Sequence, residues 1–294
     1  MKKTLIIGSS GSLGKEILKK YENHERVLTY NDNAIKSGVK FDAVNMDLEK
    51  TIKELETFNN AILLLADKNP NSCYKNRKFS NKLNVLSIKK ILSILKKYKI
   101  KPIFLSTDVV FSGNKGNYIE SDKPDPILLY GKQKTTIENF IRENFKEYLI
   151  FRLSKTFSVN RKSSSEPFYN WLDFFEKENT IYCATDQIYN PISIEDAAEI
   201  IFQISKKNLN GIFNLAGPKS FSRYEIFEKL YNEYSKFRKK KIKLVECSFN
   251  QLNKNFERWP LNTSMIIDKT LQNININFLS VEDATKETIK NYFN

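Results

Sequence analysis

Short apolar runs separated by longer amphipathic stretches dominate the first half of the chain. Each run is a few residues long, which suits a strand buried on both faces of a sheet. Between them, residues 81–98 carry leucine and isoleucine at helical spacing, with lysines on the other face. The alternation predicts an α/β fold with a doubly wound parallel sheet. The predicted strands are residues 4–7, 26–30, 41–46, 61–65, 103–105 and 148–153.

Beyond residue 153 the alternation loosens. Helical patterns remain at 167–177 and 222–237, after Ser193 and after Ser280, and short extended stretches lie at 186–191 and 211–216. Ser193 is followed by an acid three residues later, which is typical of a helix N-cap. We therefore expect one α/β domain at 1–153, joined by 186–206, and a smaller α+β lobe that comprises mainly 154–294.

Composition and charge indicate which kinds of partner the chain can bind. Its formal net charge is +14, but the lysines are spread along all 294 residues, so we expect no binding to nucleic acid. The longest apolar run, 61–66, is far shorter than the roughly 18–20 residues of a membrane span. The apolar segment after the first lysines is also too short for a signal peptide. We expect a cytoplasmic protein with no membrane span.

The cysteines and the histidine exclude several kinds of chemistry. Cys73, Cys183 and Cys247 are scattered and odd in number, which fits neither a disulfide framework nor a metal site. His24, the single histidine, lies in a polar stretch that is typical of a surface. We therefore expect no metal and no catalytic histidine.

A glycine-rich turn follows the first predicted strand and precedes a helical pattern. Gly8, Gly11 and Gly14 have the spacing G-x-x-G-x-x-G. Such glycines let the backbone approach a pyrophosphate, whose charge is favoured by the helix N-terminus. An ordinary strand-to-helix turn is the alternative. The position favours a Rossmann dinucleotide-binding domain, with Gly8, Gly11, Ser12 and Leu13 as cofactor contacts.

Later strand ends supply further candidate cofactor contacts. No acid stands directly after the second strand, where Asn31 lies and Asp32 comes late, so NADP is favoured over NAD. Asp47 and Leu48 are predicted to contact the adenine ring. Leu65 and Ala66 are predicted to lie along the crevice.

The stretch 106–134 carries the reactive groups. Ser106-Thr107-Asp108 follows an apolar strand, and Tyr130 and Lys134 stand four apart at the start of a helical pattern, so they share one face. An alcohol, a phenol and an ammonium can together protonate a substrate oxygen. A second pair with the same spacing is Tyr74 and Lys78, and we expect Tyr74 to lie in a polar loop without such a strand end. We therefore expect Thr107, Tyr130 and Lys134 to be catalytic.

With these motifs the chain resembles an extended short-chain dehydrogenase/reductase, and most closely the dTDP-4-dehydrorhamnose reductase branch. The likeness spans essentially the whole chain in the right order. The matching residues are Gly8, Gly11, Gly14, Asn84-Val85, 106–111, Gly113, Tyr130, Lys134, Asp186-Gln187, Asn190-Pro191, 211–217 and 260–264.

The resemblance implies NAD(P)H-dependent reduction of a nucleotide-linked 4-keto sugar, in the synthesis of surface-polysaccharide precursors. It makes the smaller lobe the substrate-binding lobe and the nucleotide-diphosphate sugar the partner, with a homodimer possible. Tyr130 would protonate the oxygen, Lys134 would lower the pKa of the phenol, and both would contact the cofactor. The substrate-binding residues implied by the resemblance are Thr107, Asp108, Val109, Phe111, Asn190 and Arg258.

Departures from the family pattern keep other functions open. Val109 stands where related dehydratases carry an acid, which favours a reductase. Leu65–Lys68, Lys155 and Trp259 replace residues that are usual near the substrate. The alternatives are a non-catalytic nucleotide-binding regulatory subunit on the same fold and a sugar-nucleotide epimerase that retains NAD.

Overall fold

The computed structural model describes residues 3–160, 167–252 and 256–294. A parallel seven-stranded sheet forms its larger part, in the order β11-β6-β5-β4-β1-β2-β3. The order reverses between β1 and β4, which makes the sheet doubly wound. The strands are β1 (Lys3–Ile7), β2 (Arg26–Tyr30), β3 (Val39–Lys40), β4 (Phe58–Leu63), β5 (Lys101–Thr107), β6 (Leu149–Leu153) and β11 (Gly211–Leu215).

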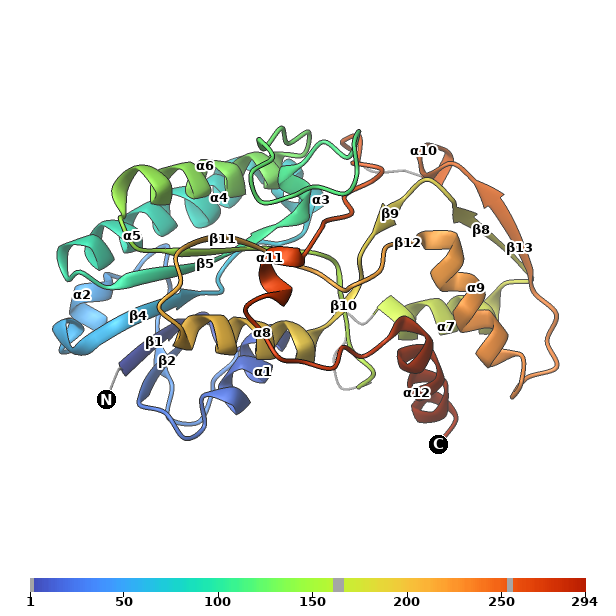
Figure 1. Ribbon diagram of the computed structural model, residues 1–294, viewed down its shortest axis with the longest axis horizontal. Coiled ribbons are helices and arrows are strands. Elements are labelled where there is room, and N and C mark those ends of the chain that lie inside the picture. The colour runs from blue at the N-terminus through green and yellow to red at the C-terminus, as the bar shows by residue number, and fades with distance from the viewer. Residues whose placement is uncertain (1–2, 161–166, 253–255) are drawn as a thin grey trace.

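Helices cover both faces of this sheet (Figure 1). One face carries α1 (Ser12–Lys20) and α8 (Ile194–Lys206), which pack against each other. The other carries α2 (Leu48–Thr51), α5 (Ile88–Lys97) and α6 (Leu129–Asn144). The helix predicted at 81–98 begins earlier, as α4 (Arg77–Asn81), and passes through a π-helical segment η2 (Lys82–Ser87) before α5.

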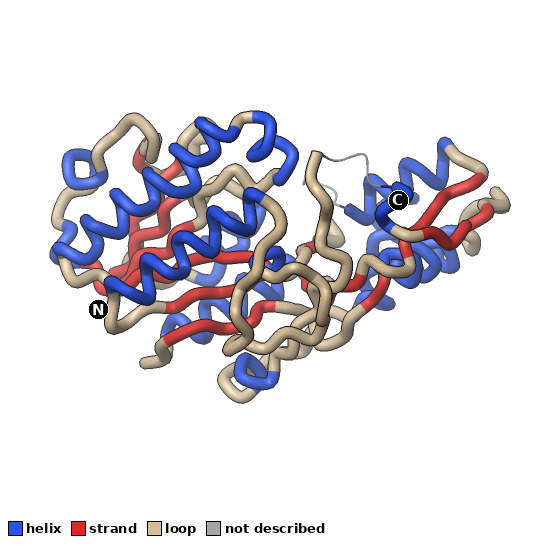
Figure 2. Tube along the Cα trace, turned by 90° about the horizontal axis from the view of Figure 1, so that it is seen from above, coloured by secondary structure: helices blue, strands red, loops and turns tan. Residues whose placement is uncertain are grey.

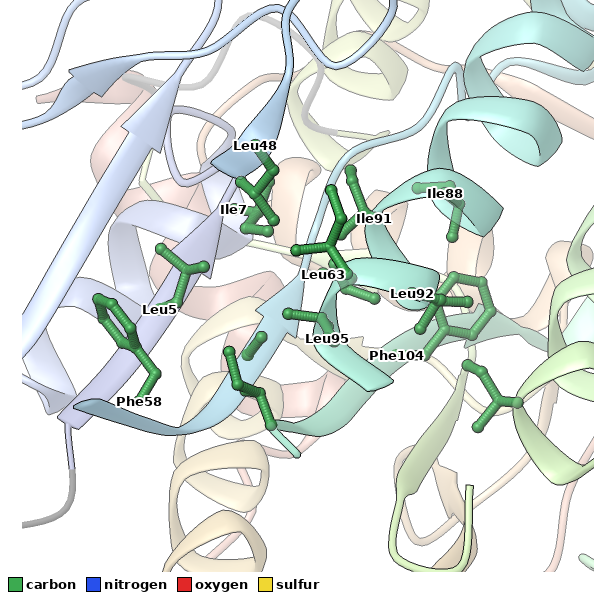
Figure 3. Close-up of a cluster of buried hydrophobic side chains, with 14 of the residues drawn as sticks. Leu5, Ile7, Leu48, Phe58, Leu63, Ile88, Ile91, Leu92, Leu95 and Phe104 are labelled. Carbon is green, nitrogen blue, oxygen red and sulfur yellow. The ribbon is translucent and has the colours of Figure 1, made fainter. Parts of the chain in front are cut away.

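The alternating side chains of the strands form a core on each face. Leu5 and Ile7 of β1 point to the α5 face, whereas Ile6 packs with α1 and α8. Figure 3 shows Ile88, Ile91, Leu92 and Leu95 of α5 gathered over Leu63 and Phe104. Of the apolar stripe predicted from helical spacing, α5 buries Ile91, Ile94 and Leu95. Leu86, in the π-helical segment, is 56% exposed, so the stripe is wrong at that residue.

The strand predicted at 41–46 is wrong, since β3 ends at Lys40. A local turn replaces it: the Asp42 carboxylate accepts hydrogen bonds from the backbone N–H groups of Val44 and Asn45, at 2.9 and 3.3 Å. Aspartate commonly competes with a strand ladder in this way. Phe41 is still buried in the core, which explains why the segment has a strand-like pattern.

A smaller lobe lies at one end of the sheet and contains the C-terminus (Figure 1). Aromatic side chains dominate its core, among them Phe168, Trp171, Phe175, Phe227 and Tyr234. The N-cap predicted at Ser193 is confirmed, since its hydroxyl accepts a hydrogen bond from the third residue of α8. Ser280 caps α12 in the same way. The elements of the smaller lobe are α7 (Pro167–Lys177), β8 (Thr180–Ala184), α9 (Arg223–Tyr234), β13 (Lys243–Cys247), α10 (Phe249–Leu252) and α12 (Val281–Phe293).

Loops and short strand pairs link the two parts, as Figure 2 shows in tan and red. The sheet takes β11 from the part of the chain that we assign mainly to the smaller lobe, and the division at residue 153 stays a proposal. Within the described ranges, no helix combines the length and the apolar character that crossing a bilayer needs. The remaining elements are η1 (Leu55–Thr57), α3 (Pro70–Lys75), η3 (Asp108–Val110), β7 (Thr156–Phe157), β9 (Ile188–Tyr189), β10 (Ile192–Ser193), β12 (Phe221–Ser222) and α11 (Asp268–Leu271).

A fully buried ion pair joins α6 to the sheet. Arg152 of β6 donates to the Glu138 carboxylate of α6 at 2.9 Å, and each side chain is 1% exposed. Ser106 of β5 donates to the same carboxylate, and Arg152 also donates to the Glu120 carbonyl. The carboxylate therefore ties two strands and one helix together.

We predict that Arg152→Met lowers the free energy of unfolding by about 3–5 kcal/mol, because it leaves the Glu138 carboxylate buried without its cation. The double variant Arg152→Met with Glu138→Gln should recover a large part of that loss, since no charge then remains buried. Urea denaturation of both variants measures the difference. Equal losses in the single and double variants would contradict this account.

Candidate active site

The switch point of the sheet positions the candidate site. Ligands of doubly wound sheets bind at the carboxyl ends of the strands where the order reverses, here between β1 and β4. The glycine turn follows β1, and Leu65 follows β4. A Cβ atom added to Gly8 would lie 3.0 Å from the Leu65 nitrogen, so the two segments meet at this edge.

The glycine turn is shaped for close approach. Gly8 has φ +81°, a conformation that disfavours side chains. A Cβ at Gly14 would overlap the Ser9 carbonyl, so this glycine lets α1 pack on the turn. Gly11, in contrast, faces open space, and as the N-cap of α1 it offers no side-chain cap. An open helix N-terminus without acids in its first turn suits an anion such as a pyrophosphate.

The other predicted cofactor contacts fall in different surroundings. Ser12 and Leu13 begin α1, and Asn31 is exposed directly after β2. Asp47 caps α2 by accepting from the Glu49 N–H at 2.9 Å, and it also pairs with Lys90. Leu48 is 1% exposed and packs in the core, so we leave its side chain out of the proposed site. Ala66 is half-buried next to Leu65.

Thr107 ends β5 and begins the turn η3. Its hydroxyl lies 3.4 Å from the Val109 nitrogen and 3.2 Å from the Asp108 carboxylate. Asp108 also accepts from the Thr263 hydroxyl at 2.7 Å, which ties η3 to the chain segment that returns from the smaller lobe. Burial raises the pKa of Asp108, and these two hydroxyl donors oppose the rise.

Tyr130 and Lys134 lie in the first two turns of α6 and are both buried. The Lys134 ammonium donates to the Leu105 carbonyl at 2.6 Å and lies 5.8 Å from the Tyr130 ring centre. Since Leu105 precedes Thr107 by two residues on β5, this bond holds the two predicted catalytic segments together. The structure therefore brings Thr107, Tyr130 and Lys134 to one edge of the sheet.

Burial shifts the two buried groups toward their neutral forms. It raises the pKa of Tyr130, and the nearby acidic groups Cys73, Asp108 and Asp67 raise it further. Burial lowers the pKa of Lys134 to about 8, against the opposing effect of Glu138. The family resemblance implied a lowered pKa for Tyr130, whereas burial and the nearby acidic groups raise it in this structure.

A polar cluster backs the site on the α3 side. Asn84, in the π-helical segment, accepts from the Asp67 N–H at 2.8 Å and donates to the Gln133 amide oxygen at 2.7 Å. Such segments often occur at functional sites. Burial raises the pKa of Cys73, in the same cluster, to about 12, with Asp67 adding to the rise. The thiol is therefore protonated and inert at neutral pH.

Several predicted substrate contacts lie elsewhere or have other partners. Phe111 is fully buried and stacks on Tyr118 with ring centres 4.0 Å apart, so we leave it out of the proposed site. Asn190 is buried and links two segments, donating to the Gly217 carbonyl and accepting from the Met265 N–H. Val109 is half-buried, and Arg258 is exposed.

Sequence reasoning missed three residues that support the site. Gln133 and Glu138 share the helix with Lys134, and the spacing of four between Lys134 and Glu138 was a usable signal. Glu257 accepts from the backbone N–H of Leu129, and nothing in the local sequence indicates this bond. Within the described residues, no three His, Cys, Asp or Glu side chains are grouped as a metal site would require.

The fold and this edge of the sheet define an extended short-chain dehydrogenase/reductase type of protein. The chain belongs to the family described as the RmlD substrate binding domain, whose model matches residues 1–294.

Three similar proteins illustrate the family. Methionine adenosyltransferase 2 subunit beta of Xenopus laevis is 24% identical over 238 residues, which are 76% of this chain and 70% of that protein. The crystal structure of a hypothetical dTDP-4-dehydrorhamnose reductase from Sulfolobus tokodaii has a TM-score of 0.79 at 25% identity and covers 96% of this chain and 99% of that one. The dTDP-4-dehydrorhamnose reductase from Bacillus anthracis str. Ames in complex with NADP also has a TM-score of 0.79, at 20% identity, and covers 99% of both chains.

We predict that Gly14→Ala lowers the free energy of unfolding by about 1–3 kcal/mol, because the added methyl group would overlap the Ser9 carbonyl. Gly11→Ala is the matched control, since its methyl group meets open space, and it should lower stability by less than about 1 kcal/mol, the scale of changing an N-cap residue. Thermal unfolding of both variants tests the difference. A Gly11 variant as unstable as the Gly14 variant would contradict the close packing described here.

Proposed function

We propose that the chain reduces a nucleotide-linked 4-keto sugar to the corresponding hydroxy sugar with NADPH or NADH. The observation that carries the proposal is the close packing of α6 on the end of β5, where Lys134 donates to the Leu105 carbonyl and lies 5.8 Å from the Tyr130 ring centre. Membership of the RmlD family and likeness to reductases named for dTDP-4-dehydrorhamnose support it.

The residues at the glycine turn fit a dinucleotide. Gly8, Gly11, Ser12 and Leu13 would hold its pyrophosphate, and Leu65 and Ala66 would lie beside it. Asn31, exposed where an acid would repel a 2′-phosphate, favours NADP over NAD. When bound, the reduced nicotinamide would supply the hydride for the sugar carbonyl.

The chain's own groups would handle the proton. With a raised pKa, Tyr130 is a protonated phenol at neutral pH, which is the form that a proton donor needs. Thr107 would hydrogen-bond the carbonyl oxygen and fix its position. Lys134, charged below about pH 8, would stabilise the phenolate that remains after the proton has left.

This function can be tested with a panel of nucleotide-linked 4-keto sugars, each supplied with NADH and with NADPH. The measurement is the loss of absorbance at about 340 nm, where the reduced nicotinamide absorbs. Consumption of reduced cofactor with one sugar nucleotide supports the proposal. No consumption across the panel, with cofactor binding intact, would refute it.

The homodimer and the cytoplasmic location stay predictions.

A second candidate function is that of a non-catalytic, nucleotide-binding subunit of a partner enzyme. The specific observation in its favour is the likeness to a methionine adenosyltransferase subunit over 76% of the chain. An NAD-retaining sugar-nucleotide epimerase is a third candidate. It would copurify with NAD and interconvert sugars with no net use of cofactor, whereas the subunit would show neither activity.

We predict that Tyr130→Phe lowers kcat by about 10²–10⁴-fold, the range for removal of a general acid. Binding of NADPH, measured by fluorescence titration, should survive because the ring remains. Tyr182→Phe is the control, since this tyrosine is 58% exposed on β8, and it should leave turnover unchanged. Turnover retained by the Tyr130 variant would remove the phenol from the mechanism.

We predict that turnover falls as pH rises through about 8. Burial lowers the pKa of Lys134 from 10.5 to about 8, so its ammonium is present below that pH and is lost above it. Lys134→Arg, which stays charged at any accessible pH, should lose this limb of the pH–rate profile even if its rate is lower. An unchanged limb in that variant would assign the titration to another group.

A further inference from the structure

The first turn of α6, which carries Tyr130, is weak by its own sequence. Leu128 stands at the N-cap and provides no side-chain cap, and the first turn contains no acid. Its third residue is Gly131, the poorest helix former apart from proline. Tyr130 therefore lies in the turn of α6 that its local sequence stabilises least.

Gly131 is required by the packing that forms the site. A Cβ atom at this position would overlap the Val109 carbonyl oxygen and come within 2.9 Å of the Pro126 side chain. The glycine lets α6 approach the turn η3 closely, and this approach brings Tyr130 toward Thr107. The geometry of the site and the weakness of the helix end thus have the same cause.

The missing cap comes from a distant part of the chain. The Glu257 carboxylate accepts a hydrogen bond from the Leu129 backbone N–H at 2.9 Å, across 128 positions of sequence. Leu129 is the first residue of α6, and its N–H has no partner within the helix. A carboxylate at this end also opposes the positive end of the helix dipole.

The segment 256–260, which we call the strap, is held to the sheet domain on both sides of Glu257. Phe256 stacks on Tyr74 of α3, with ring centres 5.8 Å apart and planes 11° apart, and the Lys75 ammonium lies 4.9 Å from its ring. Toward the other end, Pro260 packs so closely on Gly113 that a Cβ atom there would lie 2.6 Å from the proline side chain. The Glu257 contact is therefore part of a docked segment.

We propose that Glu257 is a positioning residue for Tyr130: the strap caps the helix that carries the phenol, and the phenol is correctly set only while the strap is docked. The proposal rests on the proposed function for its kinetic consequence. Arg258, predicted to bind substrate, is the next residue of the strap. A substrate held by Arg258 would thus favour the strap position that orders Tyr130.

Three variants of the full chain test the proposal. Glu257→Ala removes the cap, and Glu257→Gln keeps an acceptor oxygen without the charge. Ser280→Ala is the matched control, because it removes the side-chain cap of another helix, α12, where the Ser280 hydroxyl accepts from the Asp283 N–H at 3.0 Å. Each variant is compared by hydrogen exchange at the Leu129 amide, by kcat and by the Kd for NADPH.

We expect Glu257→Ala to speed exchange at Leu129 and to lower kcat, each by about tenfold, which is the scale of losing one helix cap. The Kd for NADPH should stay within about twofold, since the glycine turn is untouched. Glu257→Gln should recover most of kcat, and Ser280→Ala should lower Tm without changing kcat or exchange at Leu129.

Two outcomes would overturn the proposal. Unchanged exchange at Leu129 in Glu257→Ala would show that the cap is not made, and faster exchange with unchanged kcat would show a cap without influence on the phenol. If the wild-type chain reduces no sugar nucleotide, the proposed function fails on its own. The positioning role is then judged by the NMR signal of the Tyr130 ring, which is assigned by its loss in Tyr130→Phe. This signal must shift in Glu257→Ala and stay unchanged in Ser280→Ala. An unchanged signal in Glu257→Ala, or an equal shift in Ser280→Ala, refutes the role.

Discussion

The close packing of α6 against the carboxyl end of β5 is the contact on which the candidate site depends. Gly131 permits the approach to Val109, and Lys134 fixes it by donating to the Leu105 carbonyl. Both contacts end on the backbone of the strand or of its turn, so they fix the start of α6 relative to the segment that carries Thr107. One turn further along, the Glu138 and Arg152 pair anchors the same helix face to β6.

This packing also sets the electrostatics of the site. A phenol and an ammonium in a dry environment both tend toward the neutral form. The ammonium of Lys134 donates to the Leu105 carbonyl and lies 4.5 Å from the Phe104 ring. The acidic groups near Tyr130 add to the rise of its pKa that burial causes. The Tyr130 phenol is thus kept in its neutral, protonated form. In the proposed function, the Lys134 ammonium acts chiefly by stabilising the phenolate that forms after proton transfer.

Elements with a repeating pattern could be predicted from the sequence, because burial on one face repeats at the period of the element. The second strand and the helix 167–177 have the expected bounds, and Ser193 caps α8 as the acid three residues later indicates. The orientation of side chains at strand ends was harder to predict from the sequence. Phe111 follows the reactive triplet but packs in the interior, because the η3 turn directs the chain back under Tyr118. Partners far apart in sequence, such as Glu257 and Leu129, carry no local signal at all.

The two tyrosine–lysine pairs show why spacing alone cannot identify a site. Tyr74 and Tyr130 each precede a lysine by four residues, and both lie in helices, so the loop predicted at Tyr74 is wrong. The Tyr74 ring stacks on Phe256 and receives the Arg77 guanidinium at 4.0 Å, so it serves as a packing surface for the strap. The Tyr130 ring is buried between a strand end and the polar cluster. What distinguishes them is the third element that each meets, a loop from the smaller lobe for Tyr74 and the end of β5 for Tyr130, and that element is fixed only when the sheet has formed.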